Sequence, residues 1–258
     1  MAQEKYVAYV GTYTHENSIG IHVYDIDMEK GKLTERSVAP ISNPSNIAVA
    51  HSGKYLYSIE DEGVASFSID ENGDLTKINQ AWIGGMRACY VEIDSDDRYL
   101  FLAGFHDGKV TMMRLNEDGS IAGIADGVFH QGVGKSSVEK RMDPRVSCTK
   151  LTPDEKYLCA VDWGLNQIKI YEVDYEEGKL HLYDILRFPF NSAPRRIRFS
   201  KDGKFAYVLE ETTNMVDIYT YDLREGKPVF EKIKTTSVLE KEDSLASGSA
   251  LEFAPDKN

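Results

Sequence analysis

Four arginines lie just before or at the start of predicted β-strands, and together they would suit an anionic ligand. They are Arg87, Arg145, Arg195 and Arg196. A guanidinium group is planar and carries several N–H donors, so a cluster of them fits carboxylates and phosphates. The alternative is pairing with the abundant acidic side chains, such as Glu92, Glu210 and Glu211. The sequence leaves both interpretations open.

Other motifs that carry chemistry are weak or missing. Gly132-Val-Gly-Lys-Ser136 is similar to the end of a phosphate-binding loop, but Phe129 stands where the first glycine is required and no helix is predicted to follow. The chain has no Gly-x-Ser-x-Gly nucleophile motif, and its six histidines include no pair at zinc-ligand spacing. We therefore expect no metal and no cofactor.

The elements that must position these arginines come from a repeat. A degenerate sequence motif of small, hydrophobic and turn-forming residues begins at Pro44 and is repeated four times, near residues 88, 146, 194 and 248. Aligned on Tyr55, Tyr99, Tyr157 and Phe205, the copies are 44, 58 and 48 residues apart. Periods of this length with strand-like content are typical of β-propeller blades.

Each copy has the pattern of a four-stranded antiparallel sheet, with alternating hydrophobic residues between turns rich in Gly, Asp and Ser. In the first copy the expected strands are 47–50, 55–59, 64–69 and 75–78, and in the fourth they are 197–199, 205–209, 216–221 and 229–235. The first strands of the five copies are expected to start near residues 46, 90, 148, 196 and 250. No long helix is predicted. The fold class is therefore an all-β propeller.

Composition agrees with a single propeller domain over residues 1–258. The chain is 41% hydrophobic and has a formal net charge of −12, which argues against a nucleic-acid partner. No apolar run approaches the ~18 residues of a membrane span, and no signal peptide is evident, so we expect no membrane partner and a cytoplasmic location. Three cysteines without a paired spacing agree with reduced, buried thiols.

Several short motifs occur in the order typical of one enzyme family. They are Tyr9–Thr14 with Gly20–Tyr24, His130–Gly134 with Arg141, Asp162–Asn166, Pro194–Arg196 and Glu210-Glu211. In these motifs the chain resembles the seven-bladed lactonase family, which includes propeller-type 6-phosphogluconolactonases and carboxy-muconate lactonizing enzymes. The resemblance runs over the whole chain and implies a propeller that is seven-bladed in the family.

The resemblance also implies a site. Catalytic roles fall to Glu211, Arg195 and His130, with Glu211 or His130 as the base that activates water and arginine stabilising the oxyanion. Substrate binding falls to Arg145, Arg196, Arg141, Asp162 and Asn166. The chain departs from the family motifs at these positions. The usual Pro-His-x-His is Pro144-Arg-Val-Ser147, the histidine after Arg195 is Arg196, and an aspartate is Asn166.

The fifth copy, Gly248–Asn258, stops before its second strand. Family members continue for roughly two more blades, and their N-terminal strand, 6–10 here, completes the last one. We therefore expect a propeller truncated at about five blades. We further expect 130–145 to form a lid over one mouth of the channel, and Arg145, Arg195, Arg196 and Glu211 to converge at one end of it.

Three functions remain open. The first is hydrolysis of a sugar lactone such as 6-phosphogluconolactone in carbohydrate metabolism. The second is a muconate-type cycloisomerase, which uses the same arginines but transfers a proton in place of attack by water. The third is a non-catalytic propeller that binds an anionic metabolite or a protein. The expected small-molecule partner is an anionic lactone or a sugar phosphate, and propellers as a fold host all three functions.

Overall fold

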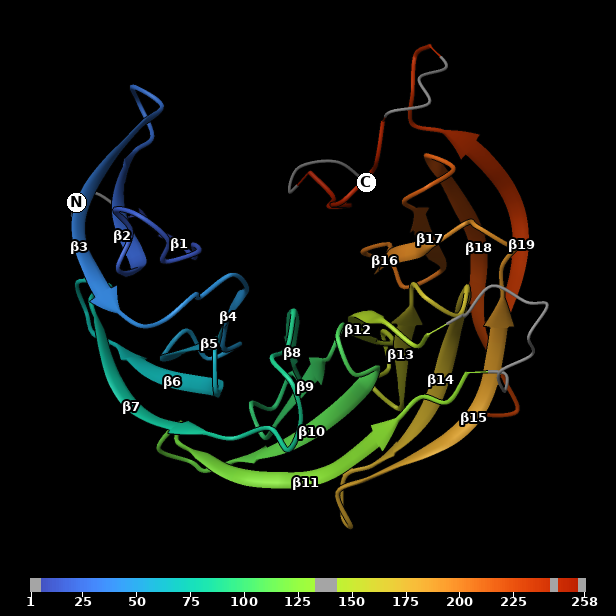
Figure 1. Ribbon diagram of the computed structural model, residues 1–258, viewed down its shortest axis with the longest axis horizontal. Helices are drawn as coiled ribbons and strands as arrows, with labels where there is room; N and C mark the ends of the chain where they lie inside the picture. The colour runs from blue at the N-terminus through green and yellow to red at the C-terminus, as the bar shows by residue number, and fades with distance from the viewer. Residues whose placement is uncertain (1–5, 133–142, 242–245, 255–258) are drawn as a thin grey trace. The chain divides into compact units, whose positions relative to one another are not determined.

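The computed structural model describes residues 6–132, 143–241 and 246–254 (Figure 1). These residues form nineteen β-strands in five antiparallel sheets, and none of them lies in a helix. The described part of the chain accordingly has no helix that is long and apolar enough to span a bilayer. The predicted fold class, an all-β propeller of four-stranded antiparallel blades, is confirmed.

The sheets follow one another along the chain, and in each of them neighbouring strands are neighbours in sequence (Figure 1). The first sheet has three strands, β1 (Tyr6–Val10), β2 (Gly20–Asp27) and β3 (Lys32–Pro40). The second has β4 (Ile47–Val49), β5 (Tyr55–Glu60), β6 (Gly63–Ile69) and β7 (Leu75–Ala81). The third has β8 (Tyr90–Ile93), β9 (Tyr99–Ala103), β10 (Lys109–Leu115) and β11 (Ile121–Phe129). The fourth has β12 (Val146–Leu151), β13 (Tyr157–Asp162), β14 (Gln167–Asp174) and β15 (Lys179–Arg187). The fifth has β16 (Pro194–Phe199), β17 (Phe205–Glu210), β18 (Met215–Arg224) and β19 (Lys227–Ser237).

The strand predictions are confirmed for four of the five copies. The first strands of these sheets begin at Ile47, Tyr90, Val146 and Pro194, within two residues of the predicted positions. The strand predicted near residue 250 is wrong, because residues 246–254 lie outside any strand. A strand requires a neighbour that completes its ladder of hydrogen bonds, and no described strand pairs with this segment.

The N-terminal strand was expected from the family resemblance to complete the last blade. In the structure β1 belongs to the first sheet, where it pairs antiparallel with β2 from Tyr6↔Ile26 to Val10↔His22. The Tyr9 hydroxyl also donates a hydrogen bond of 2.8 Å to the Gly73 carbonyl, in the β6–β7 turn. The packing of β1 is therefore local to the first two sheets.

The repeated sequence motif specifies the same hairpin turn between the first and second strands of each copy. Two residues before the aligned aromatic, all four copies adopt a left-handed backbone, with φ of 70° at Gly53, 55° at Asp97, 56° at Glu155 and 71° at Gly203. In three of the four copies the side chain five residues before the aromatic, Asp94, Thr152 or Ser200, closes the turn by accepting a hydrogen bond from the aromatic residue's amide. Ser200 Oγ, for example, accepts a 2.9 Å hydrogen bond from the Phe205 amide. The Gly, Asp and Ser residues recur because this turn needs them.

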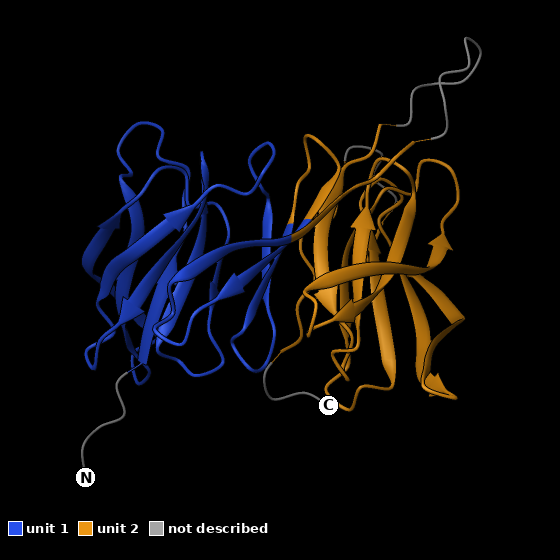
Figure 2. Ribbon diagram, turned by 90° about the horizontal axis from the view of Figure 1, so that it is seen from below, with its two compact units in different colours: residues 1–102, 111–125 blue, residues 103–110, 126–258 orange. Residues whose placement is uncertain are grey.

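Contacts between residues divide the chain into two compact units (Figure 2). Unit 1 comprises Met1–Leu102 and Thr111–Ala125, and unit 2 comprises Ala103–Val110 and Asp126–Asn258. Unit 1 has its own buried core, to which Tyr57, Ile59, Leu100 and Leu102 belong. In unit 2 the second strand β13 is buried along its whole length, and β17 is buried at four of its six residues. The single-domain assignment of residues 1–258 stays a prediction.

Candidate functional site

An arginine and a glutamate of the predicted site meet in unit 2. Arg195 Nη1 donates a 2.9 Å hydrogen bond to Glu211 Oε2, and both side chains are about one-quarter exposed. Arg195 lies at a β-bulge, because Pro194 pairs with Glu210 whereas Arg196 already pairs with Leu209. A bulge inserts one extra residue into a strand and turns its side chain away from the regular pattern. The bulge thus directs Arg195 towards the residue that follows β17.

Two further side chains hold the same carboxylate. Trp163, which follows β13, donates its indole N–H to Glu211 Oε2 at 2.6 Å. Ser247 Oγ donates to the other oxygen, Oε1, at 3.1 Å. Glu211 therefore accepts hydrogen bonds from three side chains that are widely separated in sequence.

Arg145 lies next to this carboxylate system without pairing with an acid. Its guanidinium carbon is 5.3 Å from the centre of the Phe105 ring and 5.9 Å from that of the Trp163 ring. The two rings are themselves 5.8 Å apart and tilted by 55°. Within the described residues no carboxylate forms an ion pair with Arg145. Arg145 is thus held by cation–π contacts, and its N–H groups are available for an anion.

Asp162 organises the backbone beneath Arg145. Its Oδ1 accepts hydrogen bonds from the amides of Arg145 (2.9 Å) and Leu165 (3.0 Å), and its Oδ2 is 2.7 Å from His130 Nδ1. Both side chains of the His130–Asp162 pair are fully buried. Burial lowers the pKa of His130, and the Asp162 carboxylate opposes that shift. The imidazole is therefore neutral near pH 7, donates from Nδ1, and has a buried Nε2 with no hydrogen-bond partner in the described part of the chain.

The remaining predicted site residues contact backbone or lie outside the described residues. Arg196 donates to the carbonyl of Ser147 and, at 3.5 Å, to that of Arg195. Asn166 is buried and has a left-handed φ of 50°. Its Oδ1 accepts a 2.9 Å hydrogen bond from the backbone amide of Ala193. Arg141 and most of the predicted lid, residues 133–142, lie outside the described residues. Among those described, no group of three or more His, Cys, Asp or Glu side chains is arranged to hold a metal.

The structure thus brings together some of the predicted residues and separates others. Arg195 and Glu211 are in contact, and Arg145 is linked to both through Trp163. His130 and Asn166 are buried supports, and within the described residues neither forms a hydrogen bond or an ion pair with Arg195 or Glu211. Sequence reasoning missed Trp163 and Phe105, although both stand six residues after an aligned aromatic, as Glu211 does. Their functional roles, like those of the predicted residues, stay predictions.

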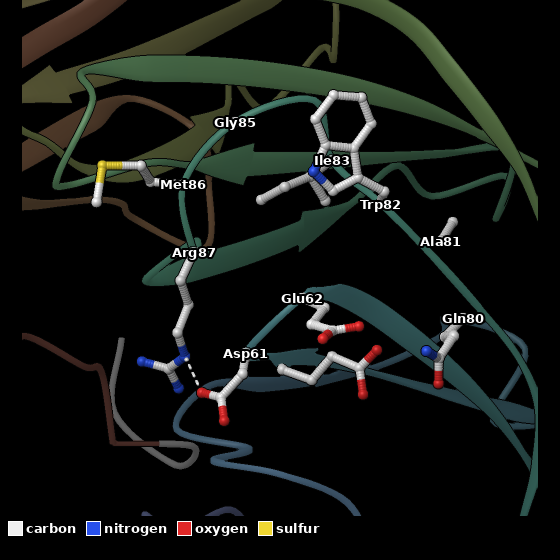
Figure 3. Close-up of a pocket in the computed structure, with 10 residues that line it drawn as sticks. Asp61, Glu62, Gln80, Ala81, Trp82, Ile83, Gly85, Met86 and Arg87 are labelled. Carbon is white, nitrogen blue, oxygen red and sulfur yellow. Dashed lines mark ion pairs between the residues drawn. The ribbon is translucent and has the colours of Figure 1, made fainter.

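Unit 1 contains a separate cavity of about 670 Å³ (Figure 3). It is lined by Glu60, Asp61, Glu62, Gln80, Ala81, Trp82, Ile83, Gly85, Met86 and Arg87. The arginine is already paired, since Arg87 Nε lies 3.4 Å from Asp61 Oδ1 and Arg87 Nη2 donates to the carbonyl of Asn43 and to Ser45 Oγ. Figure 3 shows the Arg87–Asp61 ion pair as a dashed line. With three carboxylates and a neutralised arginine, this cavity is unsuited to an anion.

The fold is that of a β-propeller, and unit 2 brings Arg195 and Glu211 into contact with Arg145 linked to them through Trp163. A family model described as "Lactonase, 7-bladed beta-propeller" matches residues 7–258, and the chain belongs to this family. The 6-phosphogluconolactonase of Bacillus subtilis is 33% identical over 259 residues, which cover 98% of this chain and 72% of that protein. An uncharacterised protein of Staphylococcus saprophyticus is 32% identical over 220 residues, which cover 83% of this chain and 63% of that protein.

A solved structure shows the same relationship. The periplasmic gluconolactonase of Pseudomonas aeruginosa superimposes with a TM-score of 0.87 at 28% identity, covering 98% of this chain and 73% of that one. The chain therefore spans roughly two thirds to three quarters of the length of these relatives.

Proposed function

We propose that this chain hydrolyses a sugar lactone that carries an anionic group, with 6-phosphogluconolactone as the first candidate. The observation that carries the proposal is Arg145, whose guanidinium packs against two neighbouring aromatic rings without an acidic partner in the described residues, beside the Arg195–Glu211 pair. Such an arginine suits a phosphate or a carboxylate. Similarity to the B. subtilis 6-phosphogluconolactonase supports the same substrate class.

In this proposal each charged residue has one task. Arg145 binds the anionic group of the lactone and so orients its ring. Arg195, held by Glu211, donates an N–H to the oxygen of the lactone carbonyl, where negative charge develops as water adds to the carbon. The ring C–O bond then breaks, and the proton lost by the water is passed to the departing alkoxide. Glu211 Oε1, which has Ser247 as its only side-chain donor in the described residues, is the oxygen that takes this proton.

The setting of the reaction belongs to the same proposal. We assign it to carbohydrate metabolism, on the strength of the B. subtilis relative. A cytoplasmic location agrees with the state of the cysteines, since Cys89, Cys148 and Cys159 are all free thiols.

A second candidate function is non-catalytic binding of the same kind of anion. This function is favoured because both residues that could act as the base already have hydrogen-bond partners. Glu211 already accepts three hydrogen bonds, and His130 is buried against Asp162. In this case the arginines would bind a sugar phosphate without converting it.

The decisive experiment measures hydrolysis of 6-phosphogluconolactone by the 258-residue chain against the spontaneous rate. We expect hydrolysis above background for the wild type. We expect a loss of about 10- to 150-fold in kcat/KM for Arg195→Ala, corresponding to the ~1.5–3 kcal/mol of a charge-assisted hydrogen bond. Arg87→Ala, which removes the paired arginine of unit 1, is the matched control and should stay within about twofold of wild type.

Two outcomes would separate the candidates. A wild-type rate equal to the spontaneous rate rejects the hydrolase, and calorimetric binding of 6-phosphogluconate by the same preparation then supports the binding function. Equal losses in Arg195→Ala and Arg87→Ala would mean that arginine truncation acts through stability, and that the site lies elsewhere.

A further inference from the structure

Trp163 contacts both charged parts of the site with different parts of its side chain. Its indole N–H donates to Glu211 Oε2 at 2.6 Å, the shorter of the two hydrogen bonds on that oxygen. Its ring lies 5.9 Å from the guanidinium of Arg145. The backbone amide of Trp163 also donates to the Arg145 carbonyl at 2.9 Å, so the two residues are fixed to each other.

We propose that Trp163 is a positioning residue that sets the geometry of the site from both sides: its N–H fixes the Glu211–Arg195 pair, and its ring face supports Arg145. The inference rests on the proposed function for its kinetic part only. Its binding and spectroscopic parts concern the anion site itself.

The N–H part follows from the way Glu211 is held. Arg195 and Trp163 donate to the same oxygen, whereas Oε1 accepts, among the residues that the structure describes, a single side-chain hydrogen bond, from Ser247 at 3.1 Å. The indole therefore fixes the rotation of the carboxylate, and with it the place where Arg195 is held. A donor to a charged acceptor at this distance is a strong hydrogen bond, which a hydrocarbon ring cannot replace.

The ring part follows from what surrounds Arg145. Its guanidinium packs on Phe105 and Trp163, and the two rings contact each other with their centres 5.8 Å apart. Aromatic faces attract a cation without occupying its N–H donors. An acid in the same place would neutralise the charge that an anion needs. The indole thus holds Arg145 in place and leaves its N–H groups available.

The hydrogen bond can be tested without a substrate. The chain has two tryptophans, and Trp82 is 68% exposed, so Trp82→Phe assigns the two indole N–H signals in a proton–nitrogen NMR spectrum. We expect the Trp163 indole proton to lie downfield of the Trp82 proton. It should move upfield in Glu211→Gln, in which the charged acceptor is lost, while the Trp82 signal stays in place. An unmoved Trp163 signal in Glu211→Gln would overturn the N–H part.

The ring is tested with inorganic phosphate as the probe and two substitutions. Trp163→Phe keeps an aromatic face and removes the N–H, whereas Trp163→Leu removes both. Titration should give a phosphate Kd within about twofold of wild type for Trp163→Phe and about three- to fivefold weaker for Trp163→Leu. Equal affinities in all three proteins would overturn the ring part. Denaturation curves for both variants show whether each is folded before it is titrated.

The kinetic readout separates positioning from stability. Trp163→Phe should lower kcat for the lactone about tenfold with KM nearly unchanged, because the substrate anion still finds Arg145 while Glu211 and Arg195 lose their alignment. A parallel change of kcat and KM, or none, would contradict this part. If the wild type shows no hydrolysis, the proposed function fails, and the phosphate and NMR measurements still decide the inference about Trp163.

Discussion

Arg87 in unit 1 and Arg145 in unit 2 occupy the same place in the repeat but have different neighbours. Each stands twelve residues before the aligned aromatic of its copy, Tyr99 or Tyr157. Arg87 is paired with Asp61 and donates to Asn43 and Ser45. Arg145 packs on the rings of Phe105 and Trp163. The repeat therefore places the arginine, and its neighbours decide whether its charge is neutralised.

One position accounts for most of the difference. Asp61 and Phe105 both stand six residues after an aligned aromatic, and each belongs to the copy that precedes its arginine. An aspartate at this position gives an ion pair, and a phenylalanine gives a cation–π contact. Trp163 and Glu211 occupy the same position in the next two copies. A propeller can thus change whether an arginine is neutralised by varying one residue type at a fixed place in each blade.

The largest effect is expected at Asp162, whose carboxylate accepts the hydrogen bond from the backbone amide of Arg145. Asp162→Ala should lower the free energy of unfolding by about 3–5 kcal/mol, because the buried His130 ring N–H and two backbone amides lose their acceptor, and each unsatisfied donor costs about 1–3 kcal/mol. Urea denaturation followed by circular dichroism measures the loss. Asp61→Ala is the control, since the Asp61 side chain is 45% exposed and an exposed ion pair contributes less than about 1 kcal/mol. Similar losses in the two variants would show that Asp162 is not a structural anchor.

A smaller effect, on binding, is expected when the neighbour of Arg145 is made to match that of Arg87. Phe105→Asp should place a carboxylate beside Arg145 and weaken phosphate binding by roughly 10- to 150-fold, equivalent to the ~1.5–3 kcal/mol of a hydrogen bond to a charged group. Calorimetric titration with inorganic phosphate measures it. Phe105→Leu keeps the site uncharged and should lose only the few-fold contribution of the ring. If the aspartate and leucine variants bind phosphate equally, the neutralisation argument is wrong.

The sequence alone was sufficient for most of the fold. The four complete copies predicted their first strands to within two residues, because the left-handed turn before each aligned aromatic leaves a clear trace of Gly, Asp and Ser. Residues 248–254 carry the first-strand pattern of the repeat without forming a strand. Pattern alone shows that a segment is suited to a strand, whereas strand formation also requires a partner that the pattern does not reveal.

The site was predicted less completely. The placement of Arg195 and Glu211 next to each other was inferred from the motifs. The β-bulge that directs Arg195 depends on the register in which β16 pairs with β17, and the sequence does not show that register. His130 was a candidate base, whereas the structure buries it against Asp162. The hydrogen bond from Trp163 to Glu211 joins residues 48 positions apart, and only the comparison of equivalent places in the copies suggests it.

The smallest effect concerns Glu60, which stands at the same place in its copy as Asp162 does. Its side chain is 7% exposed, and its nearest cation, Lys77 Nζ, is 3.7 Å away. Burial raises the pKa of Glu60 above its ordinary value of 4.5, and Lys77 opposes this only in part. The folded protein therefore holds this proton to higher pH than the unfolded chain does, so ionisation of Glu60 removes stability as the pH rises through the folded pKa.

Glu60→Gln should accordingly match the wild type near pH 4 and exceed its stability at pH 7 by less than about 1 kcal/mol, because the amide does not ionise. Urea denaturation at a series of pH values measures the difference. Asp162→Asn should show the opposite sign at pH 7, since an amide at Asp162 presents one acceptor where the carboxylate presents two. A Glu60→Gln variant that is less stable than wild type at pH 7 would mean that the Lys77 ion pair outweighs burial, and that both copies use this acid as an anchor.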